Sequence, residues 1–226
     1  MKTPMNVAVI TPYYQESGAL LRQGHESVLN QTYPCRHVLV ADGVPQDELS
    51  TWEADHLLLP KSHHDIGSTP RLIGCYHAIG LGYDAVAFLD ADNWYREDHI
   101  ATLVELAVAN AAGFASSGRM LCRLDGSEMA ACPTTNPERF IDTSCMMFLR
   151  PAFFILSTWV LMPAYGHLIG DRIMLQRVRQ SGIKTVHHPE PTVYYRCGKA
   201  GIYRSLGEPI PPGVQNPPDY QTAFRL

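Results

Sequence analysis

The chain has 226 residues, a formal net charge of −4, 46% hydrophobic residues and 18% charged residues. This length predicts a single domain over residues 1–226, because a chain of this size can bury most of its apolar surface around one core. The charge balance excludes a basic nucleic-acid-binding protein and a disordered acidic chain, so we expect no nucleic-acid partner.

The six cysteines indicate a reducing compartment, because they show neither CxxC spacing nor the density of a disulfide scaffold. The N-terminus reaches Pro4 too soon to form a signal peptide. The longest apolar run, residues 152–165, is shorter than the ~20 residues that span a bilayer. We therefore predict a core helix there and a cytoplasmic location. The alternative is a membrane-facing helix, with peripheral contact at the inner face of the membrane.

The first half of the chain alternates between strand and helix patterns. Buried strands are predicted at residues 7–10 and 37–41, with a third that ends at Asp90. Helices are predicted at residues 17–30, from Pro70 onward, and at residues 97–111. This alternation predicts an α/β fold with a mostly parallel central sheet flanked by helices.

Three polar features follow the predicted strands directly: residues 11–14, Asp42 with Gly43, and Asp90 with Asp92. Ligands of such sheets gather at the carboxyl ends of the strands. We therefore expect these three features to share one edge of the sheet.

The second half has a less regular pattern. One or two strands are predicted within residues 113–124, and further strands at 140–149, 184–188 and 192–195. Helices are predicted to start at Pro151 and to cover residues 170–181. Residues 206–226 hold five prolines, which is typical of an extended tail or lid with little regular structure.

Asp90 and Asp92 follow an apolar strand and are separated by one small residue. Two carboxylates at this spacing can direct oxygens toward one point, which suits Mg²⁺ or Mn²⁺ completed by substrate phosphates. The alternative is that they cap the next helix or accept hydrogen bonds from turn amides. The pair alone does not decide between these readings.

Two longer segments carry a resemblance to a known family. The first, VAVITPYYQESGALLRQGHESVLNQTYPCRHVLVADG, and the second, STPRLIGCYHAIGLGYDAVAFLDADNWY, resemble the opening of family 2 glycosyltransferases of the GT-A fold. That pattern runs P-x-Y-N-E, S-[VIL]-L-x-Q-T-Y-P, D-D-G, A-R-N-x-G and D-x-D, in the order found here. The resemblance implies a GT-A Rossmann-like sandwich with a nucleotide-sugar-binding half at residues 1–112 and an acceptor-side half at 113–205.

The resemblance also implies which residues surround a nucleotide-diphospho-sugar donor. These are Pro12, Tyr14, Glu16, Asp42, Arg71, Asp90 and Asp92. In the family the match of Asp42 contacts the base, that of Asp90 meets the ribose side, and that of Asp92 binds the Mn²⁺ or Mg²⁺ ion. His187 and His188 are typical of strand-edge histidines and are left off the metal site.

Asp171 matches the family's catalytic base, which takes the proton of the acceptor hydroxyl. An aspartate in the first turn of a helix is also a favoured cap, which is the alternative role. The chain departs from the family at Gly170, where a glutamate is usual, and at Gln15, Ala41 and Leu72, so the nucleotide stays open.

Together these features predict a metal-dependent, inverting glycosyltransferase that moves a sugar, first of all from a UDP-sugar, to an acceptor hydroxyl. The acceptor could be a glycan, a lipid-linked molecule or a small molecule. One alternative is a catalytically silent sugar-nucleotide-binding or assembly subunit. A sugar-phosphate nucleotidyltransferase is disfavoured, because the loop TPYYQESGALLRQ lacks the glycine- and basic-rich character that holds a triphosphate.

Overall fold

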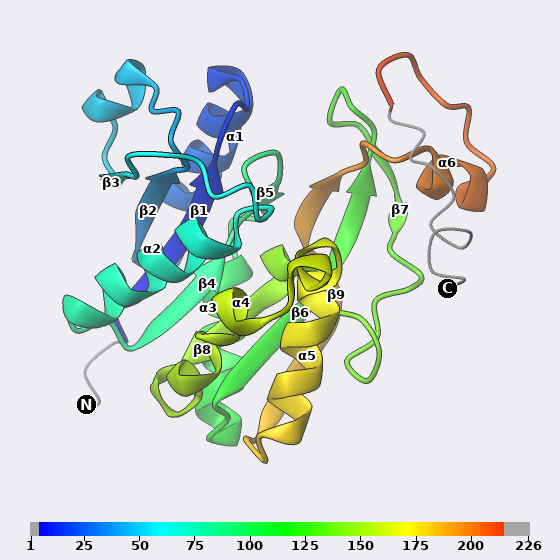
Figure 1. Cartoon of the computed structure of the whole chain (residues 1–226). Coiled ribbons are helices and arrows are strands. Elements are labelled where there is room, and N and C mark those ends of the chain that lie inside the picture. Colours follow the sequence, from blue (N-terminus) through cyan, green and yellow to red (C-terminus); the bar gives the residue numbers. More distant parts are fainter. Residues whose placement is uncertain (1–4, 215–226) are drawn as a thin grey trace.

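The computed structural model describes residues 5–214, and Figure 1 shows a sheet flanked by helices on both faces. The strands are β1 (Val7–Tyr13), β2 (Cys35–Ala41), β3 (Asp55–Leu58), β4 (Ala85–Phe88), β5 (Trp94–Tyr95), β6 (Phe114–Cys122), β7 (Glu128–Ala131), β8 (Met146–Leu149) and β9 (Thr185–Arg196). The α-helices are α1 (Gly18–Leu29), α2 (Ser68–Gly80), α3 (His99–Asn110), α4 (Thr158–Leu161), α5 (Gly170–Gln180) and α6 (Ala200–Leu206). The 3₁₀ helices are η1 (Asp47–Thr51), η2 (Thr143–Cys145), η3 (Arg150–Ile155) and η4 (Ala164–Ile169).

The strands form one sheet in the order β3-β2-β1-β4-β8-β6-β9-β5, with β7 beside β6. Strands β3, β2, β1 and β4 are parallel, whereas β8 is antiparallel to both β4 and β6. The α/β class is confirmed, but the sheet is mixed and the prediction of a mostly parallel sheet is wrong. The second half lacks the strand–helix alternation that parallel neighbours require, so its strands pair in both directions.

The two faces of the sheet carry different helices. Gly74 of α2 lies against Ile10 and Val40, where an added Cβ would be 2.6 Å from the nearest Ile10 methyl carbon. Helix α4 packs beside α2 on this face, in front in Figure 1. On the opposite face, His25 of α1 contacts His37 of β2. The N-terminus of α3 lies beside the end of α1, because the Ile100 N–H donates to Gln31 Oε1 at 2.9 Å.

Strand β1 extends three residues past the predicted end, through Pro12. Strand β4 pairs with β1 only as far as Ile10, opposite Phe88, so β1 has a single neighbouring strand beyond that point. Proline is tolerated where a strand lacks a partner on one side. The tip of β1 is therefore left open toward the site described below.

The predicted core helix over residues 152–165 is wrong. The segment instead forms η3, the single turn of α4, and the start of η4. Pro163 cannot donate a backbone hydrogen bond within a helix, and the residue before a proline is disfavoured in helical conformation. Consistent with this, α4 ends at Leu161 and Met162 is extended. In the described part of the chain, no helix is both long and apolar enough to cross a membrane.

Strand β9 is one strand rather than the two predicted at 184–188 and 192–195. Its register against β6 shifts on either side of Gly118, opposite Pro189 and Pro191. A Cβ at Gly118 would lie 2.6 Å from the carbonyl oxygen of Pro189. A glycine opposite the prolines thus lets the irregular strand continue, as at a β-bulge.

The remaining differences concern short elements. The predicted strand 140–149 is reduced to β8, because η2 takes up its middle, and β6 is one strand within 113–124. Strands β3 and β5 and helix α6 are not predicted from the sequence. Residues 207–214 of the proline-rich tail form no helix or strand, as expected, and residues 215–226 lie outside the described range.

Candidate active site

A pocket of about 470 Å³ opens where β1, β2 and β4 end. It receives residues from all three strand tips and also from α2, η2, η4 and α5 of the second half. All eight residues predicted from the sequence line it: Pro12, Tyr14, Glu16, Asp42, Arg71, Asp90, Asp92 and Asp171. The expected common edge of the sheet is therefore present.

Asp42 follows β2 and is buried against the loop at residues 62–63. Its carboxylate accepts hydrogen bonds from the Ser62 hydroxyl at 3.0 Å and from the His63 backbone N–H at 3.1 Å. It also forms a 2.8 Å pair with Nδ1 of His63. Gly43 has a φ of +80°, and a Cβ there would lie 2.2 Å from the Ser62 nitrogen. Asp42 therefore fastens this loop over the pocket, with His64 facing the cavity.

Tyr14 and Glu16 shape the opposite side of the β1 tip. The Tyr14 backbone N–H donates to Glu16 Oε2 at 2.7 Å, and the Glu16 carbonyl oxygen accepts from Gln46 Nε2 at 2.6 Å. The neighbouring Tyr13 also lines the pocket, and its hydroxyl lies 2.7 Å from His56 Nε2. These bonds fix the turn between β1 and α1 that borders the pocket.

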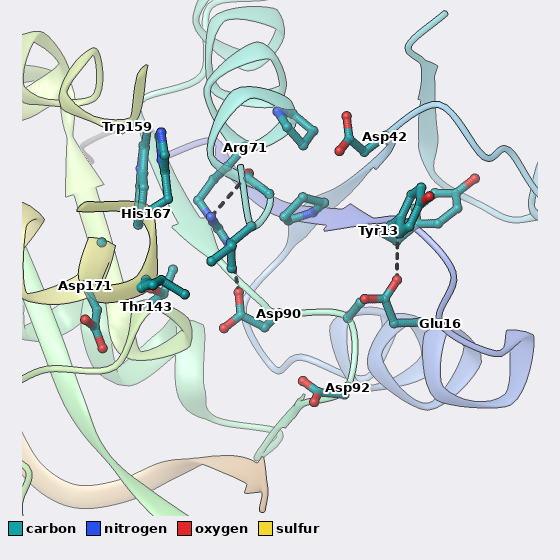
Figure 2. Close-up of a pocket in the computed structure, with 18 of the residues that line it drawn as sticks. Tyr13, Glu16, Asp42, Arg71, Asp90, Asp92, Thr143, Trp159, His167 and Asp171 are labelled. Carbon is teal, nitrogen blue, oxygen red and sulfur yellow. Dashed lines mark hydrogen bonds and ion pairs between the residues drawn. The ribbon is translucent and has the colours of Figure 1, made fainter. Parts of the chain in front are cut away.

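Arg71 neutralises the first aspartate of the D-x-D pair. Its Nη2 lies 2.7 Å from Asp90 Oδ1, and its Nη1 donates to the carbonyl oxygen of Gly67 at 3.2 Å. The guanidinium carbon lies 4.6 Å from the ring centroid of Trp159, a cation–π geometry. Figure 2 shows Asp90 between Arg71 and Asp92. Because Arg71 is buried at 6% exposure, this pairing is fixed within the fold.

Asp92 has no comparable partner. No hydrogen bond or ion pair joins its carboxylate to another residue within 5–214. Burial, and then the nearby charge of Asp90, raise the pKa of Asp92 to about 7. An unpaired carboxylate in such a setting is disfavoured unless a cation compensates it. The donor set therefore fits a hard divalent cation.

The protein alone would leave such a cation incompletely coordinated. Within the described residues there is no group of three or more His, Cys, Asp or Glu side chains that could hold a metal. Magnesium typically keeps waters and is completed by substrate phosphates, so two aspartates suffice when a phosphate is bound. His187 lies 3.0 Å from the Ser116 hydroxyl on β6, and neither it nor His188 lines the pocket.

The loop that carries the two aspartates is held by a turn that sequence reasoning missed. Ser144 of η2 accepts hydrogen bonds from the Asp90 backbone N–H at 3.1 Å and from the Asn93 side-chain amide at 3.0 Å. Asp142 caps this turn by accepting the Ser144 N–H at 3.0 Å and pairs with the buried Arg119. The Asp-x-Ser spacing is typical of an Asx turn and could have identified it.

Asp171 lies in the first turn of α5 and accepts the backbone N–H of Arg172 at 2.7 Å. Burial, followed by the charge of Asp142, raises the pKa of Asp171 to about 6. Gly170, where the family usually has glutamate, lies against Trp159, since an added Cβ would be 2.9 Å from the indole ring. The chain thus keeps the carboxylate of Asp171, whereas position 170 packs against Trp159 and carries no carboxylate.

Several further pocket residues were not predicted. They come from loops and from the second half: Ser62, His64, Ile66, Thr143, Trp159, His167, Leu168, Tyr195 and Lys199. Nδ1 of His167 lies 2.9 Å from the Ser68 hydroxyl at the start of α2, which links the two halves. Lys199 is exposed and lines the pocket, and its side chain has no hydrogen bond or ion pair with another described residue. No local motif distinguishes these residues in the sequence.

The charges of the pocket limit what it can bind. Six carboxylate residues line it, against two cationic side chains, Arg71 and Lys199. Arg71 is already paired with Asp90, and Asp142 is paired with Arg119. An anionic ligand such as a diphosphate would therefore meet unpaired negative charge here, which a bound cation would offset.

Comparison of the sequence with protein families gives one match, to the family described as Glycosyl transferase family 2, over residues 8–160. The chain belongs to this family. The match includes the tips of β1, β2 and β4, whereas the pocket residues that follow α4, Asp171 among them, lie outside it. Comparison with curated protein sequences finds no match.

Solved structures share the fold of this family member. TarS residues 1–349 from S. aureus in complex with UDP superimposes with a TM-score of 0.63 at 11% identity, covering 89% of this chain and 63% of that one. The complex of the same TarS fragment with UDP-GlcNAc gives a TM-score of 0.61 at 10% identity, covering 85% and 58%. The chain thus spans less than two thirds of these TarS fragments, and the likeness shows the GT-A fold.

Proposed function

We propose that this protein transfers a sugar from a nucleoside diphosphate donor, a UDP-sugar first of all, to an acceptor hydroxyl with inversion at the sugar. The observation that carries the proposal is the unpaired Asp92 carboxylate in a pocket whose carboxylates outnumber its cations. A divalent cation bound together with the diphosphate would supply the missing positive charge. The TarS neighbours, which bind UDP and UDP-GlcNAc, support this class of donor.

The residues divide into groups by position. Asp92 would hold Mn²⁺ or Mg²⁺, which stabilises the charge that develops on the leaving diphosphate. Asp90, held in place by Arg71, would meet the ribose side of the donor. The nucleotide would lie along the tips of β1 and β2, bordered by four residues of the pocket: Pro12, Tyr14, Glu16 and Asp42.

Asp171 is the proposed base, because it lies in the same pocket on the side away from Glu16 in Figure 2. With a pKa raised to about 6 by burial, its carboxylate is largely ionised at neutral pH and still basic enough to accept a proton. Only the ionised form can act, so turnover should fall as pH drops below about 6. A rate that stays level between pH 7 and pH 5 would argue against this role.

The test is release of UDP from a panel of UDP-sugars with Mn²⁺, comparing wild type with Asp171→Asn. Loss of a general base is expected to lower turnover by a factor of about 10²–10⁴ while donor affinity by calorimetry stays within about twofold. Glu105→Gln is the matched control, since this exposed carboxylate lies on α3 across the sheet. Unchanged turnover in Asp171→Asn would remove Asp171 as the base.

The same assay separates the enzyme from a silent binding subunit. A binding subunit would hold UDP with Mn²⁺ but release none from any donor, in wild type and variant alike. Wild-type UDP release that depends on Asp171 would instead show that the protein cleaves the bond between the sugar and the diphosphate.

A further inference from the structure

The segment between β8 and α5 presents an unusual number of apolar side chains to solvent. Of the fourteen large hydrophobic side chains exposed within residues 5–214, six lie in only sixteen residues. They are Phe154, Val160, Leu161, Tyr165, Leu168 and Ile169. We call them the outer apolar surface. Phe154 is 65% exposed and Leu161 is 76% exposed, so these side chains have little contact with the rest of the protein.

The inward side of the same segment is well packed. Ala152, Ile155, Leu156 and Trp159 are buried and belong to the main hydrophobic core. The short turns of η3, α4 and η4 therefore hold a fixed inner face and expose an apolar outer face. A concentrated exposed apolar surface on a well-packed base is typical of an interaction site.

A groove next to this surface adds positive charge. It has a volume of about 210 Å³ and runs between η3–α4 and the C-terminal half of α5, with Phe154 and Leu161 on one side and Arg177 on the other. Arg177 is exposed and forms no ion pair with any residue in the described range. A groove with apolar side chains on one side and an unpaired guanidinium on the other suits a partner with an apolar interior and an anionic edge.

The charge of this region is opposite to that of the whole chain. Residues 150–181 contain four arginines and one aspartate, a net charge of +3, in a chain whose net charge is −4. Arg150 pairs with Asp84 and Arg179 with Glu138, which leaves Arg172 and Arg177 without an ion pair among the described residues. Arg177 lines the groove together with Phe154 and Leu161, so its unpaired positive charge lies beside the outer apolar surface.

We propose that this surface docks the protein onto an anionic lipid bilayer. Leucine and phenylalanine side chains can enter the boundary between headgroups and acyl chains, where tyrosine side chains also reside. Arginine side chains beside them meet the negative headgroups and extend to them from an apolar surface. A second copy of this chain fits less well, because a symmetric contact here brings the same arginines of both copies together.

The position of the surface relates docking to the active site. His167 and Leu168 of η4 line the pocket, and Leu168 also belongs to the outer apolar surface. A bilayer in contact with this surface would lie next to the mouth of the pocket. If the proposed transferase function holds, this placement favours an acceptor carried by a lipid.

The test is co-sedimentation of the full chain with phosphatidylcholine vesicles, with and without phosphatidylglycerol, in the absence of any donor. Wild type is expected to bind the anionic vesicles, and to bind them more weakly as salt is raised. Leu161→Glu and Phe154→Glu should each weaken binding at least tenfold. Arg177→Glu should weaken binding to the anionic vesicles only.

Val108→Glu is the matched control, because Val108 is 49% exposed on α3, on the opposite face of the sheet. It should bind vesicles like wild type, and circular dichroism should show all variants folded. Failure of wild type to bind, or equal loss in Val108→Glu, would overturn the proposal. A wild-type dimer that Leu161→Glu dissociates, with no vesicle binding, would assign the surface to self-association instead.

The result is independent of the transferase proposal. Leu161 and Phe154 lie outside the pocket, so UDP release without vesicles should be unchanged in their variants. An active protein that ignores vesicles would overturn docking alone. A protein that binds vesicles but releases no UDP would overturn transfer alone.

Discussion

The buried ion pair between Arg119 and Asp142 supports the floor of the pocket, and its removal should have a large and non-additive effect. The two side chains are 7% and 9% exposed. The Arg119 guanidinium also lies 4.0 Å from the ring centroid of Tyr195. Asp142→Asn leaves Arg119 charged and buried, and breaking such a pair typically costs about 3–5 kcal/mol.

Arg119→Met leaves the buried Asp142 carboxylate unpaired and should lower the free energy of unfolding by a similar amount. The double variant removes both charges, so its cost should be close to that of one single variant, with a coupling of about 3 kcal/mol. Urea unfolding followed by tryptophan fluorescence measures these free energies, provided that the denaturant slopes agree.

The control is the surface pair of Arg179 and Glu138, at 2.9 Å with side chains 52% and 71% exposed. Glu138→Gln should cost less than about 1 kcal/mol, because solvent screens such pairs. If the Arg119 and Asp142 losses simply add in the double variant, or match the Glu138→Gln loss, the pair does not support the pocket as we argue.

Three further predictions test other parts of the structure. Ser144→Ala removes the acceptor of two buried donors and should cost about 1–3 kcal/mol in urea unfolding, with weaker Mn²⁺-dependent UDP binding; wild-type values for both would contradict its role. Burial lowers the pKa of His99 to about 3. The neutral imidazole therefore contributes fully to the free energy of unfolding above pH 6.5, and this contribution is lost as pH falls toward 3. Between pH 7 and pH 5 the free energy of unfolding should therefore fall by about 2 kcal/mol more in wild type than in His99→Gln. Equal falls in the two proteins would contradict this. Lys199→Ala should weaken UDP binding by about 1 kcal/mol but leave UMP binding unchanged, since the exposed ammonium can reach only a diphosphate at the rim; equal effects on both nucleotides would refute that position.

The first half of the fold follows from local sequence patterns. The apolar run of residues 7–10 lies in β1, the run of 37–41 in β2, and the helices predicted at 17–30 and 97–111 are found as α1 and α3. The two strands are buried on both faces, as continuous apolar runs predict, and the two helices are buried on the face that their periodicity shows. The polar residues at the strand ends then converge because the strands are parallel.

The second half depends on contacts that no local pattern shows. Strand β9 continues through two prolines because Gly118, about seventy residues earlier, makes room for them. The apolar run at 152–165 is not one helix, because Pro163 interrupts it and packing of Trp159 against Arg71 favours short turns. Local periodicity cannot report such distant partners.

The residues of the candidate site also differ in how far the sequence predicts them. Asp42, Asp90 and Asp92 could be predicted, because each follows a recognisable strand. The spacing of Asp142 and Ser144 indicates a turn, but the place of Asp142 and Lys199 in the pocket could not be predicted, since it arises only when the second half folds across the strand tips. The roles assigned to all of these residues stay predictions that the experiments above address.

Titration calorimetry of UDP with and without Mn²⁺, in wild type and in Asp92→Asn, tests the central claim most directly. The amide keeps the shape of the side chain but removes the charge that we assign to the cation. We predict that Mn²⁺ strengthens UDP binding to wild type by about tenfold or more, or about 1.4 kcal/mol, and has little effect on Asp92→Asn. Equal UDP affinity with and without Mn²⁺ in wild type, or an undiminished Mn²⁺ effect in the variant, would contradict the account.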